Sequence, residues 1–248
     1  SFSMIVLEKE LSKPYEMIDM VTTPDGSLVA MVHCNNCTSD INAWVGLFKE
    51  YQQLLGVPVD MNELYGKLFN EALKGDTDCG GLMAYNYVSG EPVTGLAEGR
   101  PMFVRSAGDK FNLANFMRAH LYGAIGVLKI GNDILLKEEK IKVDRITGHG
   151  GYFKTAGVGQ RMLAAALNSP ISVMETAGEG GAWGIALLAG YLINNNGKNL
   201  ADYLEDVVFA GNTGVSIAPT AEDVAGFEKY IENYKRCLPI EQAAVDNK

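Results

Sequence analysis

The stretch Ile146-Thr147-Gly148-His149-Gly150-Gly151-Tyr152-Phe153-Lys154-Thr155 decides the fold class. A strand-like apolar run ends in glycines, and a helix-like segment, residues 157–168, follows. Glycine permits tight turns and lets a backbone approach a ligand, so such a junction is typical of ligand sites in α/β proteins. Phe153 excludes both the P-loop and the dinucleotide fingerprint, because it stands where each requires a small residue. A tight turn that binds nothing is the alternative interpretation.

A second junction of the same kind follows. The strand-like residues 171–174 precede Gly178-Glu179-Gly180-Gly181-Ala182, which opens an apolar segment, residues 182–192. The two junctions are expected to form opposite walls of one crevice at the carboxyl edge of a sheet. Residues 182–192 are apolar nearly all round, which predicts a buried helix. Close packing of that helix explains its small residues almost as well as a ligand does.

The rest of the chain surrounds these junctions with a regular order of elements. Strands are predicted at residues 4–7, 16–21, 28–32 and 82–88, and Pro24-Asp25-Gly26 is a hairpin turn. Helices are predicted at residues 38–51, 61–73 and 224–238, and the tail after residue 239 is expected to fray. A long helix follows from the spacing of Leu113, Met117, Leu121, Ala124 and Leu128. Strands first and alternation later indicate an α/β fold with a mixed sheet flanked by helices.

Composition excludes several classes of protein. The 248 residues carry a formal net charge of −9, which argues against sequence-independent nucleic-acid binding. No apolar run approaches the length of a membrane span. Four cysteines do not make a disulfide scaffold, and they are interpreted as reduced thiols of a cytoplasmic protein.

Candidate catalytic and metal-binding residues are few. Cys34 and Cys37 form a C-x₂-C pair, which supplies only two of the four ligands of a structural zinc site, so no metal site is predicted. No Ser/His/Asp set and no carboxylate pair stands out. Asp40 is interpreted as a helix cap and Glu91 as a surface charge, which leaves the chain without an evident general base.

Two histidines have different expected roles. His120 lies mid-helix among apolar residues and is interpreted as a core histidine with satisfied hydrogen bonds. His149 lies inside the first glycine stretch, where it is the better placed of the two to contact a ligand.

Five motifs in order resemble the C-terminal domain of the FGGY family of carbohydrate kinases, which includes xylulokinase, ribulokinase and glycerol kinase. The resemblance covers nearly the whole chain and is strongest over residues 81–192. Its motifs are Asp40-Ile41-Asn42-Ala43-Trp44, the segment from Tyr85 to Pro92, residues 112–119 with Gly123, the segment from Gly150 to Thr155 with Gln160, and residues 181–189.

The resemblance implies a ribonuclease-H-like, actin-like ATPase fold in which residues 1–248 form the nucleotide-binding domain. An N-terminal domain with the sugar pocket and the catalytic aspartate is expected to lie outside this chain. The implied activity is phosphorylation of a sugar by ATP with Mg²⁺, the sugar being a ketopentose such as xylulose or ribulose. A homodimer is a further expectation, and this chain alone is expected to be inactive. The implied nucleotide-binding residues are Gly148, Gly150, Gly151, Lys154, Thr155, Gly181 and Gly184.

Departures from the family pattern keep two alternatives open. Tyr152 and Phe153 replace small residues of the glycine motif, and the family's Glu-Arg-Thr-Pro segment is reduced to Glu91-Pro92-Val93-Thr94. One alternative is a non-catalytic actin-like module that binds a nucleotide or a partner. The other is a different α/β enzyme that uses the glycine turn for another phosphate ligand.

Overall fold

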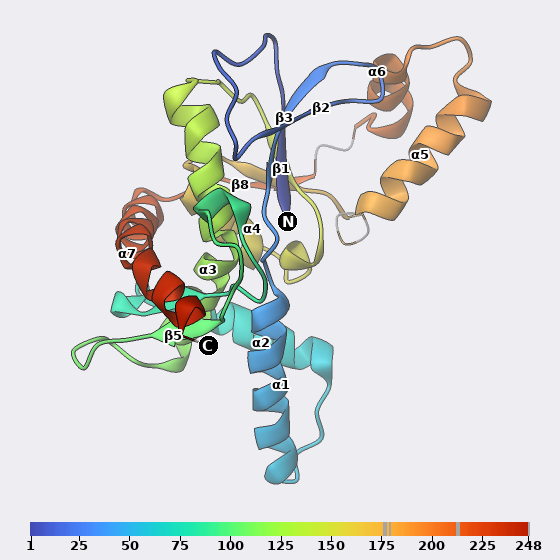
Figure 1. Cartoon of the computed structure of the whole chain (residues 1–248). Helices are drawn as coiled ribbons and strands as arrows, with labels where there is room; N and C mark the ends of the chain where they lie inside the picture. The colour runs from blue at the N-terminus through green and yellow to red at the C-terminus, as the bar shows by residue number, and fades with distance from the viewer. Residues whose placement is uncertain (176–177, 179, 212–213, 248) are drawn as a thin grey trace.

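The computed structural model describes residues 1–175, 178, 180–211 and 214–247, and Figure 1 shows their course. Strands and helices alternate after an antiparallel start, which confirms the predicted α/β class. The strands are β1 (Phe2–Val6), β2 (Asp19–Thr22), β3 (Leu28–His33), β4 (Met83–Tyr85), β5 (Met102–Val104), β6 (Ile146–Gly148), β7 (Ile171–Val173) and β8 (Val215–Ile217). The helices are α1 (Ser39–Leu54), α2 (Met61–Ala72), α3 (Leu113–Asp133), α4 (Val158–Leu167), α5 (Gly180–Asn194), α6 (Leu200–Tyr203) and α7 (Ala221–Asp246).

The described strands are divided among three small sheets. β1, β3 and β2 form an antiparallel sheet with β3 in the middle, and β4 pairs with β5 in a separate hairpin. β6 and β7 run parallel while β8 runs antiparallel to β7, so this third sheet is mixed. The predicted turn joins β2 to β3, where Gly26 adopts a φ of +92° that favours glycine. Among the described strands, β1 and β6 therefore each pair along one edge only.

Helix α3 is the centre of the core. Its spacing predicted one apolar face, yet nearly every position from residue 115 to 132 is buried, because α2, α4, α7 and β4 pack around it. A Cβ atom at Gly123 would lie 2.5 Å from the carbonyl oxygen of Ala84, so glycine is needed where α3 crosses β4. Tyr230 of α7 is also buried and donates its hydroxyl to the carbonyl of Ala119 at 3.2 Å.

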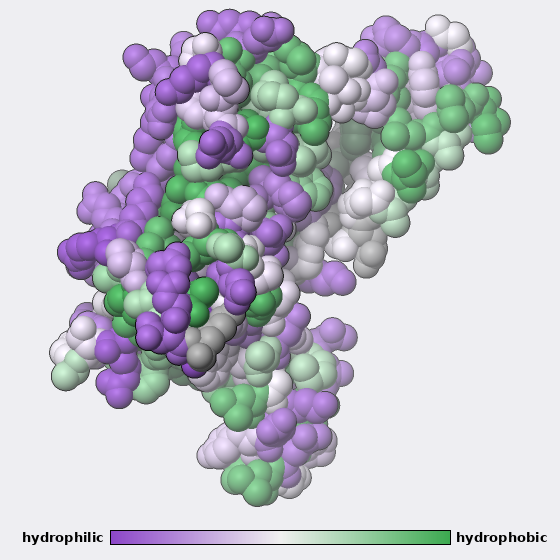
Figure 2. All heavy atoms as spheres, in the orientation of Figure 1, coloured by the Kyte–Doolittle hydropathy of each residue, from purple (hydrophilic) through white to green (hydrophobic). Residues whose placement is uncertain are grey.

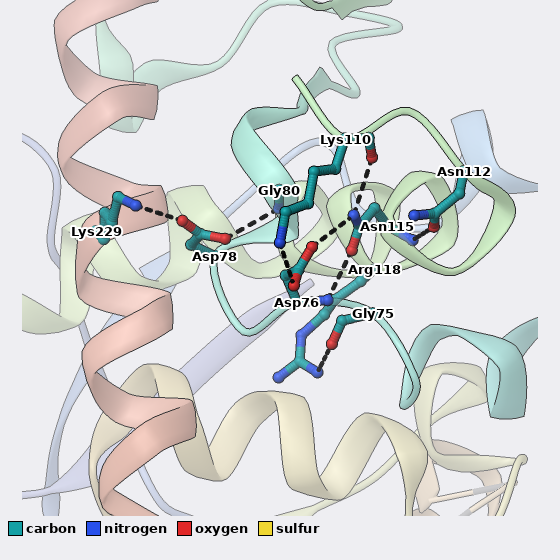
Figure 3. A network of polar contacts seen from close by, with 9 residues as sticks. All are labelled: Gly75, Asp76, Asp78, Gly80, Lys110, Asn112, Asn115, Arg118 and Lys229. Atoms are coloured by element: carbon teal, nitrogen blue, oxygen red, sulfur yellow. Dashed lines mark hydrogen bonds and ion pairs between the residues drawn. The ribbon is translucent and has the colours of Figure 1, made fainter. Parts of the chain in front are cut away.

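The first turn of α3 fixes the loop that follows α2 (Figure 3). The side chain of Asn115 accepts the N–H of Asp76 at 2.7 Å and donates to the Asp76 carboxylate at 3.0 Å and to the carbonyl of Lys110 at 2.9 Å. Cβ atoms at Gly75 and Gly80 would lie 2.9 and 2.5 Å from the Asn115 side chain. Only glycine therefore fits at these two positions beside the buried amide.

A buried ion pair joins three helices. Arg118 of α3 donates from Nη2 to Oδ1 of Asp223 in α7 at 2.6 Å, and their side chains are 2% and 1% exposed. Arg161 of α4 donates from Nε to the other carboxylate oxygen at 2.9 Å. Thr220, which precedes α7, donates its hydroxyl to the same oxygen at 2.8 Å. The carboxylate of Asp223 thus has charged or polar partners on both oxygens, as a buried charge requires.

The C-terminal tail is ordered, and the prediction that it frays after residue 239 was wrong. Helix α7 continues through Pro239 to Asp246. Glu241 is fully buried and accepts the main-chain N–H of Arg100 at 2.6 Å, while the Arg100 guanidinium donates to the carbonyl of Ala244 at 2.9 Å. These tertiary contacts hold the last turns of the helix in place despite the proline.

Helix α5 forms as predicted but is exposed, so the expectation of a buried helix was wrong. It projects from the body of the protein beside α6, and hydrophobic residues lie on its surface (Figures 1 and 2). None of its residues is buried, and Leu192 and Ile193 are 78% and 82% exposed. Apolar composition predicts that a helix needs a partner, but the ring contacts of α5 in the described chain are few: Tyr191 packs on Tyr203 of the short α6, and Trp183 packs on Phe209. No described helix combines the length and hydropathy needed to cross a membrane.

Candidate functional site

A cavity of about 1540 Å³ lies between β1 and the carboxyl end of β6. One wall is formed by the N-terminal residues 1–9, and another by residues 139–150, which lead into and out of β6. Gly178, Gly180, Gly181 and Ala182 contribute a third part of the lining. Both β1 and β6 turn an edge without a strand partner among the described residues toward this cavity. Both glycine stretches reach this cavity.

The first glycine stretch uses its glycines for different reasons. Gly150 has a φ of +105°, a backbone conformation that other residues rarely adopt. A Cβ atom at Gly148 would lie 2.5 Å from the ring of Phe153, which packs directly on this glycine. Gly151 has neither restriction, because no atom lies within 4 Å of the place where its Cβ would be. The backbone at Gly150 and Gly151 therefore borders open space.

The second glycine stretch lies against the first. A Cβ atom at Gly180 would lie 3.0 Å from both Cβ and Nδ1 of His149, and one at Gly178 would lie 3.5 Å from Cε of Lys154. The two stretches are thus neighbours on one cavity, in direct contact instead of on the opposite walls that were predicted. Residues 176, 177 and 179, which belong to or adjoin the second stretch, lie outside the described residues.

The predicted ligand-binding residues divide into two groups. Gly148, Gly150 and Gly181 line the cavity, as does His149. The other four do not line it: Gly151, Lys154 and Thr155 lie on the turn that leaves β6, and Gly184 lies one turn into the projecting helix α5.

The two aromatic residues of the glycine motif leave the cavity open. Tyr152 points into the core, where its hydroxyl donates to the carbonyl of Leu121 at 2.9 Å, and burial raises its pKa well above the usual range. Phe153 packs edge-to-face on Tyr152 with 5.5 Å between ring centroids. Both rings contribute to the wall of the cavity without filling it.

The cavity has a positively charged rim that sequence reasoning missed. Lys9, Lys140, Lys142 and Arg145 line it and form no ion pair within the described part of the chain. Of the acidic residues beside them, Glu139 accepts hydrogen bonds from Ser12, at 3.1 Å to its N–H, and from the Tyr15 hydroxyl at 2.6 Å. These four cations only slightly outnumber the three acidic residues that also line the cavity, Glu8, Glu139 and Asp144, but in a chain of net charge −9 even this balance favours an anionic ligand beside the cations. The signal in the sequence was three cations within residues 140–145, just before the glycines.

A buried hydrogen-bond network beside the cavity was also missed, because Glu91 was interpreted as a surface charge. Glu91 is in fact fully buried, and its Oε2 accepts the main-chain N–H of Asn36 at 3.2 Å and the Asn36 amide at 3.1 Å. The Asn36 side-chain oxygen accepts the N–H groups of Val88 and Ser89 at 3.0 and 3.1 Å. The loop after β3 is therefore fixed to the loop after β4, and Cys37, at the end of the first loop, lines the cavity.

The remaining candidates also differ from their predicted roles. Asp40 lies in the first turn of α1 with its side chain 10% exposed, and the residue before the helix, Thr38, makes no capping hydrogen bond. His120 is buried, but neither ring nitrogen has a hydrogen-bond partner in the described structure, so it is not the satisfied histidine that was expected.

The thiols are free, and burial raises the pKa of Cys34 to about 12. Burial likewise raises the pKa of Cys37 and of Cys79. Within the described residues no group of three or more His, Cys, Asp or Glu side chains could hold a metal ion.

Comparisons with known proteins identify relatives of this chain. Residues 1–193 match the C-terminal domain of the FGGY family of carbohydrate kinases. No curated protein matches the chain.

Three solved structures illustrate the likeness in fold. A ligand-bound xylulose kinase from Lactobacillus acidophilus is 19% identical with a TM-score of 0.67, covering 94% of this chain and 43% of its own. A gluconate kinase from the same species is 18% identical with a TM-score of 0.68, covering 94% of this chain and 44% of its own. The glycerol kinase of Plasmodium falciparum with ADP is 13% identical with a TM-score of 0.62, covering 95% and 45%. The chain thus spans less than half the length of these kinases, and its fold is theirs.

Proposed function

This chain belongs to the FGGY family of carbohydrate kinases, and we propose that it forms the nucleotide-binding half of an enzyme that phosphorylates a sugar with ATP. Residues 1–248 would act as one domain. The sugar pocket and the catalytic aspartate would be supplied by an N-terminal domain like the one that the longer relatives contain. The observation that carries the proposal is the contact of the two glycine stretches, Gly180 against His149, on one open cavity.

The proposal gives the residues of the cavity different tasks. The backbone at Gly150 and Gly181 would let the adenosine approach closely, since no side chain stands between the main chain and the cavity there. Lys140, Lys142 and Arg145 would attract the negatively charged phosphates. Phe153, packed on Gly148, would offer an apolar edge to the base. These tasks are binding and orientation, on which phosphoryl transfer chiefly depends.

Mg²⁺ belongs to the proposal as part of the nucleotide substrate. It would bridge phosphate oxygens and neutralise charge during transfer. The described residues offer no cluster of acidic or imidazole ligands, so the proposal assigns no residue of this chain to the ion. That distribution agrees with the usual behaviour of Mg²⁺, which keeps most of its ligands as phosphate and water.

For the sugar, we propose a ketopentose such as xylulose or ribulose. The support is the segment Asp40-Ile41-Asn42-Ala43-Trp44, which resembles the ribulokinase and xylulokinase branches, together with the likeness to xylulose kinases. The likeness to a gluconate kinase and a glycerol kinase makes these sugars and polyols the alternatives to be tested. The test is the activity of the full-length gene product against ketopentoses, gluconate and glycerol.

Nucleotide binding by this chain is tested by isothermal titration with ADP, ATP and NAD. We expect weak but saturable binding of both adenine nucleotides and none of NAD. Gly181→Leu should weaken binding about tenfold or more without loss of stability, because Gly181 lines the cavity and the added side chain would enter space that is open in the free protein. Gly66→Leu is the matched control, since Gly66 on α2 also has no neighbour within 4 Å of its missing Cβ.

The outcomes separate the proposal from its alternatives. Equal affinity of wild type and Gly181→Leu would remove the second glycine stretch from the site. Binding of NAD in preference to ADP would favour a different α/β enzyme. Binding of ADP together with a full-length product that phosphorylates none of the sugars would favour a non-catalytic actin-like module.

A further inference from the structure

A second, smaller cavity of about 280 Å³ lies between α1 and β5 and shares no lining residue with the larger one. Helix α1 contributes Asp40, Ala43, Trp44 and Leu47 to its lining, and the β5 region contributes Pro101, Met102 and Phe103. Its walls are therefore apolar and aromatic except for one carboxylate. At about 30 Å³ per water-sized group, it has room for a ligand of about nine heavy atoms.

The carboxylate in this cavity lacks an adequate partner. The side chain of Asp40 is only 10% exposed, and its one ionic contact in the described structure is Nδ1 of His120 at 3.5 Å. That distance is beyond a good hydrogen bond, and both ring nitrogens of His120 lack a hydrogen-bond partner in the described structure. Neither Asp40 oxygen receives a hydrogen bond from the described residues, yet neither is sealed from solvent, so the cavity gives a donor group access to this carboxylate.

The arginines on α3 and on either side of β5 have partners elsewhere. Arg118, two residues before His120 on α3, is paired with Asp223 at 2.6 Å. Arg105, just after β5, lies over the ring of Phe111 at 4.9 Å from its centroid. Arg100, just before β5, donates to the carbonyl of Ala244. The counter-charge of Asp40 is therefore not supplied by these neighbours.

The aromatic rings around the carboxylate define the kind of group that would fit. Trp44 and Phe103 line the cavity, and both pack on His120, with ring centroids 5.3 and 5.8 Å from it. Aromatic faces beside a desolvated carboxylate are the usual surroundings of an organic cation, which gains both the ion pair and the cation–π contact. A metal ion is not favoured, because Asp40 is the only carboxylate that lines the cavity.

We propose that this cavity binds a small organic cation, an ammonium compound of up to about nine heavy atoms. The carboxylate of Asp40 would be its counter-ion, and the rings of Trp44 and Phe103 would be its walls. The site is independent of the nucleotide cavity, so it stands or falls separately from the function proposed above.

The test uses the fluorescence of Trp44 in the full chain. The chain has two tryptophans, and Trp183→Phe leaves Trp44 as the reporter. We expect a saturable change of its emission with choline. The uncharged carbon analogue 3,3-dimethyl-1-butanol has nearly the same shape and should bind about tenfold or more weakly, because it forms no ion pair and no cation–π contact.

Two variants complete the test. Asp40→Asn should abolish the response to choline, while Asp19→Asn, which removes an exposed carboxylate on β2, should leave it unchanged. If Asp40→Asn does not fold, Phe103→Leu decides, since it keeps the charge and removes one ring and should weaken choline binding. The proposal is overturned if choline gives no saturable response, if the uncharged analogue binds equally well, or if the variants of the cavity bind as the wild type does.

Discussion

The side chain of Asn36 and the carboxylate of Glu91 are 55 residues apart in sequence and meet in the core, 3.1 Å apart. The main-chain N–H of Asn36 donates to the same carboxylate oxygen, while the other oxygen of Glu91 is buried without a partner in the described structure. Burial is the dominant influence on Glu91. It raises the pKa of the carboxyl group, although the two hydrogen bonds from Asn36 act to lower it. The stability of the fold should therefore depend on the charge of this residue.

Glu91→Gln should make the stability less dependent on pH. Because folding raises the pKa of Glu91 above its ordinary value of 4.5, the folded state holds this proton more tightly than the unfolded state. The contribution to stability is complete below pH 4.5 and is lost as pH rises through the raised pKa. Urea unfolding at pH 5 and pH 8 should show the variant gaining stability relative to wild type at the higher pH. The prediction would be contradicted if the difference in unfolding free energy between Glu91→Gln and wild type were the same at both pH values. That constant difference is expected for the exposed control Glu16→Gln.

Asp223→Ala should destabilise the protein by about 3–5 kcal/mol, because it leaves the buried guanidinium of Arg118 without a counter-charge. Lys67→Ala breaks the exposed pair of Lys67 with Glu63 and should cost at most about 1 kcal/mol. Chemical denaturation at neutral pH measures both. A loss below about 1 kcal/mol for Asp223→Ala would mean that water reaches the pair.

Acid should weaken the same ion pair. Burial acts to raise the pKa of Asp223, but hydrogen bonds from Thr220, Arg118 and Arg161 outweigh it and lower the pKa below the ordinary 3.8. The stabilisation is therefore complete above pH 3.8 and is lost as pH falls through the lowered value. Below pH 3.8 the difference in unfolding free energy between wild type and Asp223→Ala should therefore shrink. A difference that persists in stronger acid would refute the ionic explanation.

The double variant Leu192→Ser and Ile193→Ser on α5 should change the free energy of unfolding by no more than about 0.5 kcal/mol, because both side chains are exposed. Met162→Ala in α4 removes a fully buried side chain and should cost about 2–5 kcal/mol. If the α5 variant were as destabilising as Met162→Ala, the conclusion would be that Leu192 and Ile193 are buried against another surface in solution.

Glu241→Ala should destabilise the protein by about 1–3 kcal/mol, because the N–H of Arg100 would lose its acceptor. The neighbouring Gln242→Ala removes only an exposed contact with Asp246 and should have little effect. Thermal unfolding of the two variants compares them directly. Equal melting temperatures would mean that the end of α7 does not contribute to the fold.

The sequence predicted best where a local pattern determines the structure. The spacing from Leu113 to Leu128 predicted α3, and Pro24-Asp25-Gly26 predicted the hairpin of β2 and β3. The two glycine stretches were predicted to share one cavity, and they do, because consecutive strand–helix junctions lie at the same sheet edge, but they contact one another instead of forming opposite walls. The short elements β5, β8 and α6 escaped prediction, because three or four residues carry too little periodicity.

Burial that depends on distant partners could not be predicted. Glu91 looked like a surface charge because nothing next to it in sequence shows that Asn36 will donate to it. The apolar α5 looked like a core helix because composition reports the need for a partner and not its presence. His120 was correctly placed in the core, but its unpartnered nitrogens depend on the position of Asp40, 80 residues away on another helix.

The ion pair of Arg118 with Asp223 joins positions 105 residues apart, and α7 follows all the other described helices in the sequence. During synthesis, α3 would leave the ribosome long before the helix that covers it. Since a core is complete only when all contributing segments are available, the nascent chain would expose the side of α3 that contacts α7 until α7 has been synthesised. This part of the core should therefore fold only after α7 is made, and chaperones could bind α3 before α7 covers it.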